Sequence, residues 1–316
     1  MNKKNLFVLT FFCIAVIIFN LTAATLPVTA DNGYYFDKNG KFVITDPNKI
    51  PKASDFNIAY SFPTKQYHRE ILSKKQQRVY DIIMTTLQQG NIEVICNMEI
   101  SETEITAVFK SIKRDHPEFF YINSLSYRAM YIKDGKYIIS VAFVYDPAFV
   151  KIGIEKAIND VKKAAEPIIN GAKKIENTAD QIKYIFEAMI DDLTYAPDVK
   201  NCLYSQNVYS GIVTKVSVCA GYSAAFQYYC NELGINCTWL ASSYHAWNLV
   251  ESDGDNYYVD VAWGDPNNFK IKYDYTYLNF TDSMTKTLSN RLNRKDAYLR
   301  DYLSSFLPSA NGQTKE

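Results

Sequence analysis

The stretch Ser217-Val218-Cys219-Ala220-Gly221-Tyr222-Ser223 decides how this chain is interpreted, because it places one cysteine at the start of a predicted helix. The residues that follow, 224–233, have helical character and end at Gly234. At a helix N-terminus, unpaired backbone N–H groups and the positive end of the helix dipole stabilise a thiolate and lower the thiol pKa. The alanine and glycine after the cysteine would leave room for a substrate. We therefore expect Cys219 to be a nucleophile.

A nucleophilic cysteine needs a base, and the sequence offers three histidines, at positions 68, 116 and 245. His68 lies beside charged residues and is expected to be solvent exposed, whereas His116 precedes a proline and is expected to cap a helix. His245 lies instead in the alternating segment 244–250, which predicts a strand that follows another strand at 234–240. We therefore assign His245 as the base.

A third apolar segment, 257–263, predicts a strand that carries one carboxylate, Asp260. Burial of an unpaired carboxylate costs several kcal/mol, so this acid needs a partner. The connection 251–256 predicts a hairpin, which would bring His245 and Asp260 face to face across two antiparallel strands. Cys219, His245 and Asp260 would then act as nucleophile, base and orienting acid.

Taken singly, each of these three residues has a structural explanation, as a buried apolar cysteine, a satisfied histidine and a capping acid. Taken together, the motifs over about residues 204–268 resemble the core of the transglutaminase-like superfamily of bacterial cysteine enzymes. The matching segments are Val218-Cys219-Ala220-Gly221-Tyr222, Gly234-Ile235, His245-Ala246-Trp247-Asn248 and the residues 258–266. The resemblance implies a papain-related α+β fold, with the cysteine-bearing helix packed on an antiparallel sheet.

Three further residues are candidates for the site. Acyl transfer forms an oxyanion, which the Gln206 side chain and the Cys219 N–H could stabilise by about 3 kcal/mol; a surface or helix-capping glutamine is the alternative. Trp247 and Trp263 are interpreted as walls of the site or as core residues, with the core interpretation preferred for Trp263. No Cys-x-x-Cys or paired His and Cys spacing predicts a metal, and no cofactor is expected.

The N-terminus resembles an export signal. Lys3 and Lys4 precede an apolar run at 6–19, and Val28-Thr29-Ala30 fits a signal-peptidase site. The run is shorter than the roughly 20 residues that span a bilayer, so we predict a removed signal peptide at 1–30, with an uncleaved anchor as the alternative. We expect a secreted or cell-envelope protein with no integral membrane span after signal removal.

The cysteine count adds one constraint. Of the 6 cysteines, Cys13 lies in the predicted signal, and an odd number remains, at positions 96, 202, 219, 230 and 237. One thiol must therefore stay free unless the protein dimerises covalently. With Cys219 free, the other four could form two disulfides in any of three connectivities or stay reduced.

The rest of the chain predicts architecture only. We expect a signal peptide at 1–30, an N-terminal α+β region at 31–150 and a transglutaminase-like catalytic region at 151–316, with one continuous domain as the alternative. Before the cysteine helix, the sequence first predicts a helix over 69–89 and a helix capped by Ser101. Two strands follow, at 119–132 and 136–145, joined by a turn at 133–135. A helix over 151–166 comes next, and then a helix from Thr178 with Gln181 in a capping box.

The balance of 34 basic and 34 acidic residues gives no net field that favours nucleic acid, so no nucleic-acid partner is expected. The expected chemistry is thiolate attack on an amide of a protein or a peptidoglycan stem peptide, which forms a thioester. Water as acceptor would make the chain a cysteine peptidase or amidase, and a primary amine would make it a transglutaminase; hydrolysis is slightly favoured. A non-catalytic peptide- or glycan-binding module on the same fold is the alternative.

Overall fold

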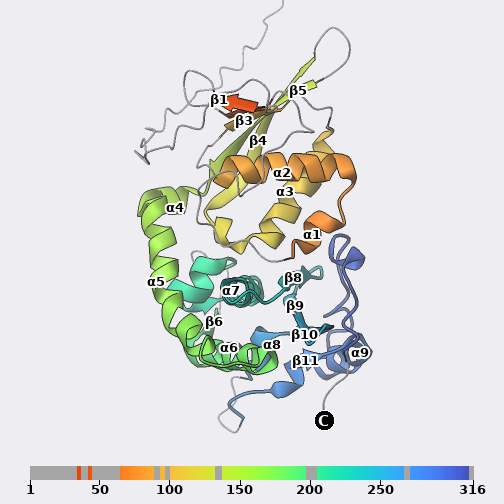
Figure 1. Cartoon of the computed structure of the whole chain (residues 1–316). Coiled ribbons are helices and arrows are strands. Elements are labelled where there is room, and N and C mark those ends of the chain that lie inside the picture. The colour runs from red at the N-terminus through yellow and green to blue at the C-terminus, as the bar shows by residue number, and fades with distance from the viewer. Residues whose placement is uncertain are drawn as a thin grey trace, which may run out of the picture.

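A computed structural model describes residues 65–88, 100–131, 137–196, 205–266 and 271–312, together with the strands at 34–36, 42–44 and 93–96. Two sheets, each with its own helices, lie at opposite ends of the molecule (Figure 1). The predicted signal peptide at 1–30 and the turn at 133–135 lie outside the described residues. No helix in the described part of the chain is long and apolar enough to cross a bilayer.

The first sheet is built from N-terminal strands. Its order is β1-β2-β3-β5-β4, with β2 and β3 parallel and the other neighbours antiparallel. The strands are β1 (Tyr34–Phe36), β2 (Phe42–Ile44), β3 (Glu93–Cys96), β4 (Ile122–Tyr131) and β5 (Tyr137–Tyr145). The two predicted strands at 119–132 and 136–145 are confirmed as the β4 and β5 hairpin, but residues 117–119 form a short 3-10 helix, η3 (Pro117–Phe119).

The helix predicted over 69–89 is in fact two helices, α1 (Tyr67–Glu70) and α2 (Lys74–Gln88). The buried Asp115 carboxylate explains the early start, because it accepts the backbone N–H groups of His68 and Arg69 at 2.9 Å each. These contacts hold α1 against α3 (Glu102–Asp115) and leave His68 with 0% exposure. The expectation of an exposed His68 is therefore wrong, because the backbone N–H groups at this position are held against the buried Asp115 carboxylate.

Two helix starts can be compared with their predicted caps. The capping box of α3 is confirmed. Ser101 Oγ accepts a hydrogen bond from the Glu104 N–H at 3.2 Å, and the Glu104 carboxylate accepts one from the Ser101 N–H at 2.8 Å. The capping box predicted with Gln181 is wrong. The cap of α6 (Thr178–Asp192) is Asn177, and the Gln181 side chain bonds to the carbonyl of Ile175 at 2.8 Å instead.

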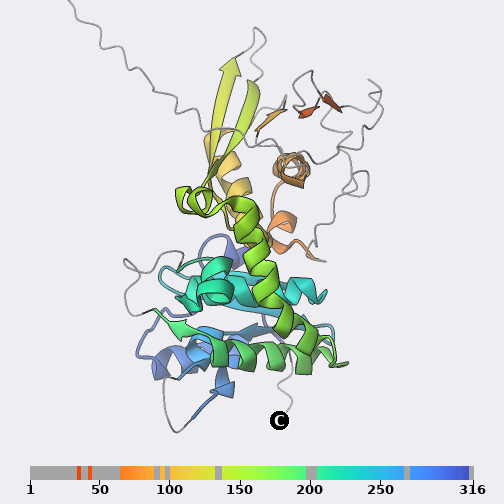
Figure 2. The ribbon, with the colours of Figure 1, turned by 90° about the vertical axis from the view of Figure 1, so that its left-hand side faces the viewer.

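One long helix runs along the side of the molecule, from below the β4 and β5 hairpin toward α6 (Figures 1 and 2). The helix predicted over 151–166 is α4 (Pro147–Ile152) followed by α5 (Ile154–Ala172), and Gly153 at φ 93° separates the two. Pro167 lies inside α5 without ending it. The helix is therefore longer than predicted, because its apolar face stays buried beyond this proline, at Ile168, Ile169 and Ala172.

The second sheet carries the predicted cysteine helix, α7 (Cys219–Glu232), which packs against β8 and β9. This sheet is antiparallel, and its order is β11-β10-β9-β8. Its strands are β8 (Cys237–Ala241), β9 (Ala246–Ser252), β10 (Asp255–Val259) and β11 (Leu278–Phe280). The expected α+β class, with a cysteine-bearing helix on an antiparallel sheet, is confirmed. α7 is apolar on most sides because other elements surround it (Figure 1).

Contacts of α3 join the two parts of the chain. The Arg114 guanidinium bonds to the Asp301 carboxylate and to Ser304 Oγ at 3.1 Å, and it lies 5.1 Å from the centre of the Trp239 ring. The side-chain amide of Gln227, on α7, donates to the Arg114 carbonyl at 2.9 Å. The domain division at residue 150 stays a prediction, although these contacts tie the two regions together.

Replacing Arg114 should weaken this connection. We expect Arg114→Ala to lower the free energy of unfolding by about 2 kcal/mol, because a nearly buried charge-assisted hydrogen-bond set and its packing on Trp239 are lost. Urea denaturation measures the change. Arg78→Ala, which removes an exposed arginine from α2, is the matched control and should change the free energy by less than about 0.5 kcal/mol. Equal effects of the two substitutions would contradict the assignment.

Candidate active site

Cys219 is the first residue of α7, at the helix start that the sequence predicts. The preceding residue, Val218, is extended and provides no side-chain cap, so the N–H groups of the first turn have no side-chain acceptor from the cap position. The positive end of the helix dipole acts at the same place. The Cys219 side chain is a partly exposed free thiol, which leaves it accessible to a reactant.

A buried cluster of hydroxyl groups fixes the chain that leads into α7. Ser217 Oγ lies 2.7 Å from Ser210 Oγ and donates to the Ser205 carbonyl at 2.9 Å. Gly221 packs on this cluster so closely that a Cβ atom would lie 2.5 Å from Ser210 Oγ. The glycine predicted to make room for a substrate is therefore buried, and the close approach of the Ser210 and Ser217 hydroxyl groups is what requires it.

His245 and Asp260 lie at the open end of one hairpin. The turn Asp253-Gly254 has positive φ at both residues, 54° and 85°, as a type I′ turn requires. His245 directly precedes β9 and Asp260 directly follows β10, so the two residues leave the paired strands at the same end. The last pair of this ladder is Val259 with Asn248.

The expectation that His245 and Asp260 stand directly opposite each other in paired strands is therefore wrong. The strand predicted over 257–263 ends at Val259, because the Asp260 carboxylate accepts the N–H of Trp263 at 3.1 Å and caps the short helix α8 (Val261–Gly264). The capping bond fixes the carboxylate in place. The side chains of His245 and Asp260 nevertheless meet, because both leave the ladder toward the same side.

The carboxylate of Asp260 is the centre of the site. It is 1% exposed, and its Oδ2 accepts the His245 Nε2–H at 2.6 Å and the Tyr298 hydroxyl at 2.9 Å. With the Trp263 N–H on Oδ1, this buried acid has three donors, which compensate for its loss of water. Tyr298 gave no signal in the sequence, because it lies 38 residues downstream in a segment without a motif.

The contact with Asp260 fixes the orientation of the His245 ring. Because a carboxylate only accepts hydrogen bonds, the proton lies on Nε2, and Nδ1 is the nitrogen left to take a proton from Cys219. The indole N–H of Trp263 donates to this Nδ1 at 3.1 Å. Trp247 stacks on the same ring, with centroids 6.0 Å apart and an angle of 13° between the planes.

Burial lowers the pKa of His245, but the charge and the hydrogen bond of Asp260, together with Cys219, outweigh it and raise the pKa to about 9. The Trp263 bond to Nδ1 opposes this rise, because an indole N–H can donate only to the neutral ring. A full negative charge at 2.6 Å exceeds the effect of one dipole, so the imidazolium is favoured at neutral pH.

The pKa of the Cys219 thiol is shifted in the complementary direction. Burial raises it, but the hydrogen bond and positive charge of His245 and the backbone N–H of Ala246 lower it to below its ordinary value. The pair Cys219 and His245 can therefore exist as thiolate and imidazolium. Such a pair is the form in which a cysteine attacks a carbonyl carbon.

The structure distinguishes Trp247 from Trp263, which the sequence left open as walls of the site or core residues. Trp247 has 0% exposure and belongs to the core cluster beneath the sheet, so it is a core residue that also backs the His245 ring. Trp263 is only partly buried and reaches Nδ1 of His245. Trp263 also packs against the same core cluster, so the preferred core interpretation holds in part, and the bond to Nδ1 adds a contact with the histidine.

The sequence predicts Gln206 as the oxyanion residue, and the structure adds Tyr195 as a second candidate. Gln206 is exposed, and its side chain makes no hydrogen bond within the described parts of the chain, so its role stays a prediction. Tyr195 lies on β6 (Thr194–Tyr195), which pairs with β7 (Val216–Ser217) directly before Cys219. Burial and the charge of Cys219 raise the pKa of the Tyr195 phenol, and the Cys219 backbone N–H, which donates to the phenol, opposes the rise. The net result is a pKa of about 12.

Tyr195 is thus a site residue that sequence reasoning missed. Its hydroxyl is protonated at neutral pH and can donate a hydrogen bond beside the sulfur. The available signal was weak, since only the pairing of β6 with β7 brings the tyrosine to the cysteine, and that strand pair is two residues long.

The other described cysteines differ from Cys219. Cys230 and Cys237 are free and have 0% exposure, so both are shielded from solvent. Cys96 and Cys202 have no described side chain, and a disulfide between those two stays open. In the described part of the chain, no group of three His, Cys, Asp or Glu residues is arranged to hold a metal.

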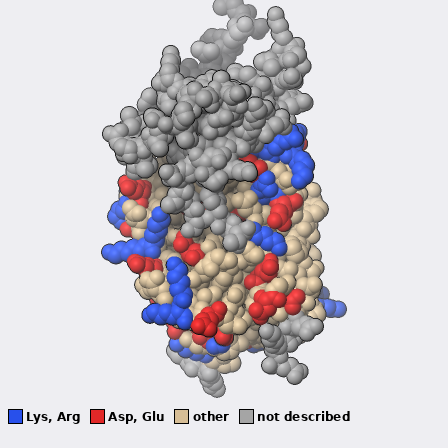
Figure 3. Space-filling view, viewed as in Figure 1, with Lys and Arg blue, Asp and Glu red and all other residues tan. Residues whose placement is uncertain are grey.

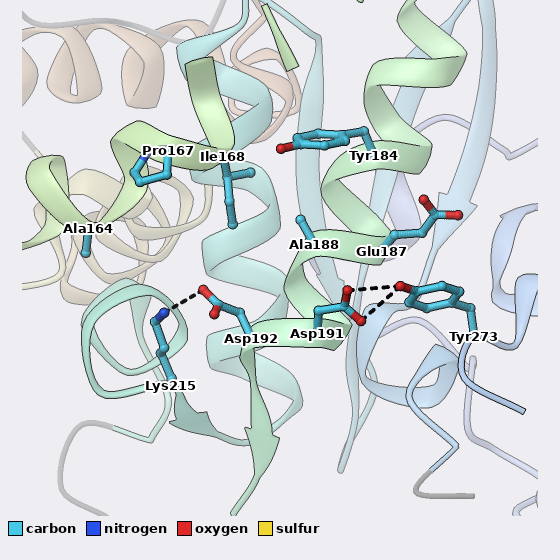
Figure 4. A pocket seen from close by; sticks show the side chains of 10 residues that line it. All are labelled: Ala164, Pro167, Ile168, Tyr184, Glu187, Ala188, Asp191, Asp192, Lys215 and Tyr273. Carbon is cyan, nitrogen blue, oxygen red and sulfur yellow. Dashed lines mark hydrogen bonds and ion pairs between the residues drawn. The ribbon is translucent and has the colours of Figure 1, made fainter. Parts of the chain in front are cut away.

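Two cavities lie away from this site. One of about 480 Å³ is bordered by α5, α6, Lys215 and Tyr273, and its polar residues pair with one another, as Asp192 does with Lys215 at 2.7 Å (Figure 4). The other, of about 590 Å³, lies beside Phe120 and Tyr228. Neither is lined by Cys219. Acidic and basic side chains are mixed on the face seen in Figure 3, with no broad area of one sign.

Among the solved structures that resemble this chain are the following two. The first is a crystal structure of a TGase, with 14% sequence identity and a TM-score of 0.31; the match covers 54% of this chain and 50% of that chain. The second is described as "a Putative Cysteine Protease from Cytophaga hutchinsonii", with 14% identity and a TM-score of 0.27, and the match covers 44% of this chain and 64% of that chain. This chain thus spans half to just under two thirds of those proteins.

No family model matches the sequence, and no curated protein matches it either. The first of the two similar structures is described as a TGase and the second as a putative cysteine protease. Because both TM-scores are below 0.5, we take the chemistry of the site from its own residues.

Replacing the carboxylate tests the electrostatics of the site. In a Cys219→Ala background, which removes the contribution of Cys219, Asp260→Asn should lower the pKa of His245 to 6.5 or below, because burial then acts without a compensating charge. NMR titration of the imidazole measures the shift. Asp296→Asn, at an exposed site in the same C-terminal segment, is the control. An unchanged pKa in Asp260→Asn would contradict the proposed pairing.

Proposed function

We propose that this protein is an exported thiol-dependent acyl-transfer enzyme that acts on amide bonds of proteins or cell-wall peptides. The observation that carries the proposal is the buried hydrogen bond of 2.6 Å between His245 and Asp260, beside a partly exposed cysteine at a helix N-terminus. Each of the three side chains has the environment that its role requires. The export signal predicted at 1–30 supports a place outside the cytoplasm.

The reaction begins from the thiolate and imidazolium pair, in which Nδ1 of His245 holds the proton of Cys219. Asp260 stabilises the imidazolium through Nε2, and the Trp263 indole N–H loses its acceptor as Nδ1 becomes protonated. The thiolate then attacks the amide carbon to form a tetrahedral intermediate. Return of the proton from His245 to the leaving nitrogen breaks the C–N bond and leaves a thioester on Cys219.

The negative oxygen of the tetrahedral intermediate needs hydrogen-bond donors. We assign the Cys219 backbone N–H as one donor, because it lies at the N-terminus of α7 and the oxyanion can replace the Tyr195 phenol as its acceptor. The Tyr195 hydroxyl, which already contacts this N–H, is the better second candidate, and Gln206 is the other. Loss of one such donor lowers kcat by about 100-fold or more in other enzymes of acyl transfer.

The two candidates for the second donor can be separated by substitution. Tyr195→Phe should lower kcat by about 100-fold with little change in KM, because the donor acts mainly in the transition state, whereas Gln206→Ala should leave kcat within about twofold. Steady-state hydrolysis of an amide substrate measures both. The reverse order of effects would assign the role to Gln206, as the sequence predicts.

The acceptor of the acyl group decides between two activities. Attack of water on the thioester gives hydrolysis, and attack of a primary amine gives a cross-link. We favour hydrolysis slightly, because the Cys219 thiol is partly exposed and water can reach it.

The function is tested by trapping the thioester. The mature protein is mixed with a reduced, denatured protein substrate, with or without a labelled primary amine, and the products are analysed by mass spectrometry. We expect an acyl adduct on Cys219 and free peptide fragments in the wild type, and neither product with Cys219→Ala or His245→Ala. Incorporation of the amine in place of cleavage would identify a transglutaminase.

A chain that binds peptides or glycans but forms no adduct would contradict the enzymatic proposal. That result would support the alternative, a non-catalytic binding module on the same fold. The buried Asp260 with three donors favours the enzyme, because a binding module has no need to hold a basic imidazole beside a thiol.

A further inference from the structure

Arg294 lies at the edge of the proposed active site. Its guanidinium carbon is 5.7 Å from the centre of the Trp263 ring and 5.8 Å from that of the Tyr244 ring. Trp263 is the residue whose indole N–H contacts Nδ1 of His245, and Tyr244 directly precedes His245 in the chain. A permanent positive charge is therefore separated from the reacting imidazole by one aromatic ring.

The backbone fixes this position of Arg294. Helix α9 (Asp282–Arg291) ends in a Schellman motif, in which Asn293 has a left-handed φ of 51°. The N–H of Arg294 donates to the Ser289 carbonyl at 3.0 Å, and the N–H of Asn293 donates to the Asn290 carbonyl at 2.9 Å. Four residues after Arg294, the Tyr298 hydroxyl binds Asp260. Both side chains thus come from one ordered segment that crosses the site.

Arg294 differs from the other arginines that lie over aromatic rings in this part of the chain. Arg291 covers Tyr277 and pairs with Asp274 at 2.7 Å. Arg300 covers Tyr258 and donates to the Leu307 carbonyl at 2.9 Å. The guanidinium of Arg294 makes no hydrogen bond or ion pair within the described residues, and its side chain is exposed.

We propose that Arg294 is a specificity residue that binds a carboxylate of the substrate near the scissile amide. The inference rests on the proposed function and adds to it the chemical class of the substrate, an acidic peptide. A guanidinium that stacks on aromatic rings keeps its N–H donors in the plane of the group, where they point away from the rings. A carboxylate is the partner whose geometry matches two of these donors at once.

The position of Arg294 limits where the carboxylate lies in the substrate. One indole ring separates the guanidinium from His245, so the carboxylate must be about one or two residues from the amide that Cys219 attacks. It can be the side chain of an acidic residue or the free end of a peptide.

The experiment compares pairs of thiol-reactive peptides that differ by one charge. Chloroacetyl-glutamic acid amide and chloroacetyl-glutamine amide place the residue on one side of the reactive carbon. Acetyl-glutamyl and acetyl-glutaminyl chloromethyl ketones place it on the other side. Chloroacetyl-glutamine with a free terminal carboxylate separates a terminal from a side-chain source. The second-order rate of Cys219 labelling is measured by mass spectrometry in the full-length mature protein.

We expect the wild type to prefer the acidic member of at least one pair, and Arg294→Ala to reduce this preference about fivefold, with the neutral probes unaffected. Arg294→Lys should keep part of the preference, because it retains the charge but loses the paired donors. Lys295→Ala removes the neighbouring exposed charge and should leave the preference unchanged.

The possible failures are distinguishable. If the neutral probes label Cys219 rapidly but Arg294→Ala changes no preference, the assignment of Arg294 is overturned while the proposed function stands. If all the probes label Cys219 no faster than an ordinary free thiol, the proposed function fails, and the assignment fails with it. An equal loss of preference in Lys295→Ala would also overturn the assignment, because a general surface field would then explain it.

Discussion

The hydrogen bond between the buried Asp260 carboxylate and His245 is the interaction on which the rest of the site depends. A carboxylate with 1% exposure is stable as an anion only if donors replace the lost water, and Asp260 has one donor each from a histidine ring, a tyrosine hydroxyl and a backbone N–H. The same charge makes His245 more basic and fixes which ring nitrogen faces Cys219. The reactivity of the cysteine therefore derives from an acid that the substrate need not contact.

Contacts from both regions of the chain hold Asp260 in place. Tyr298 belongs to the segment after α9, and Asp301 anchors the same segment by pairing with Arg114 of the N-terminal region. Through Asp301 and Tyr298, α3 thus helps to position the Asp260 carboxylate, although α3 lies far from Asp260 in sequence. In the same segment, Arg294 extends over Trp263 at the edge of the site. One C-terminal stretch therefore serves both the geometry of the site and the proposed choice of substrate.

The sequence predicted the elements whose signals are local. The α7 start at Cys219, the hairpin around Gly254 and the Ser101 capping box follow from residue types that act on their immediate neighbours. It predicted poorly where distant contacts override local pattern: His68 is buried because Asp115 holds the backbone beside it, and β10 stops at Val259 because Asp260 caps α8. Tyr195 and Tyr298 could not be found from sequence, since only the tertiary fold brings their hydroxyl groups to the site.

The measurement that tests the central claim most directly is the ultraviolet absorbance of the Cys219 thiolate as a function of pH, taken as the difference between wild type and Cys219→Ala. We predict a thiolate that titrates below the ordinary thiol pKa of 9.0, because the His245 imidazolium stabilises it. A difference spectrum that develops only near the ordinary pKa would show that no ion pair forms. Asp260 would then have a structural role alone.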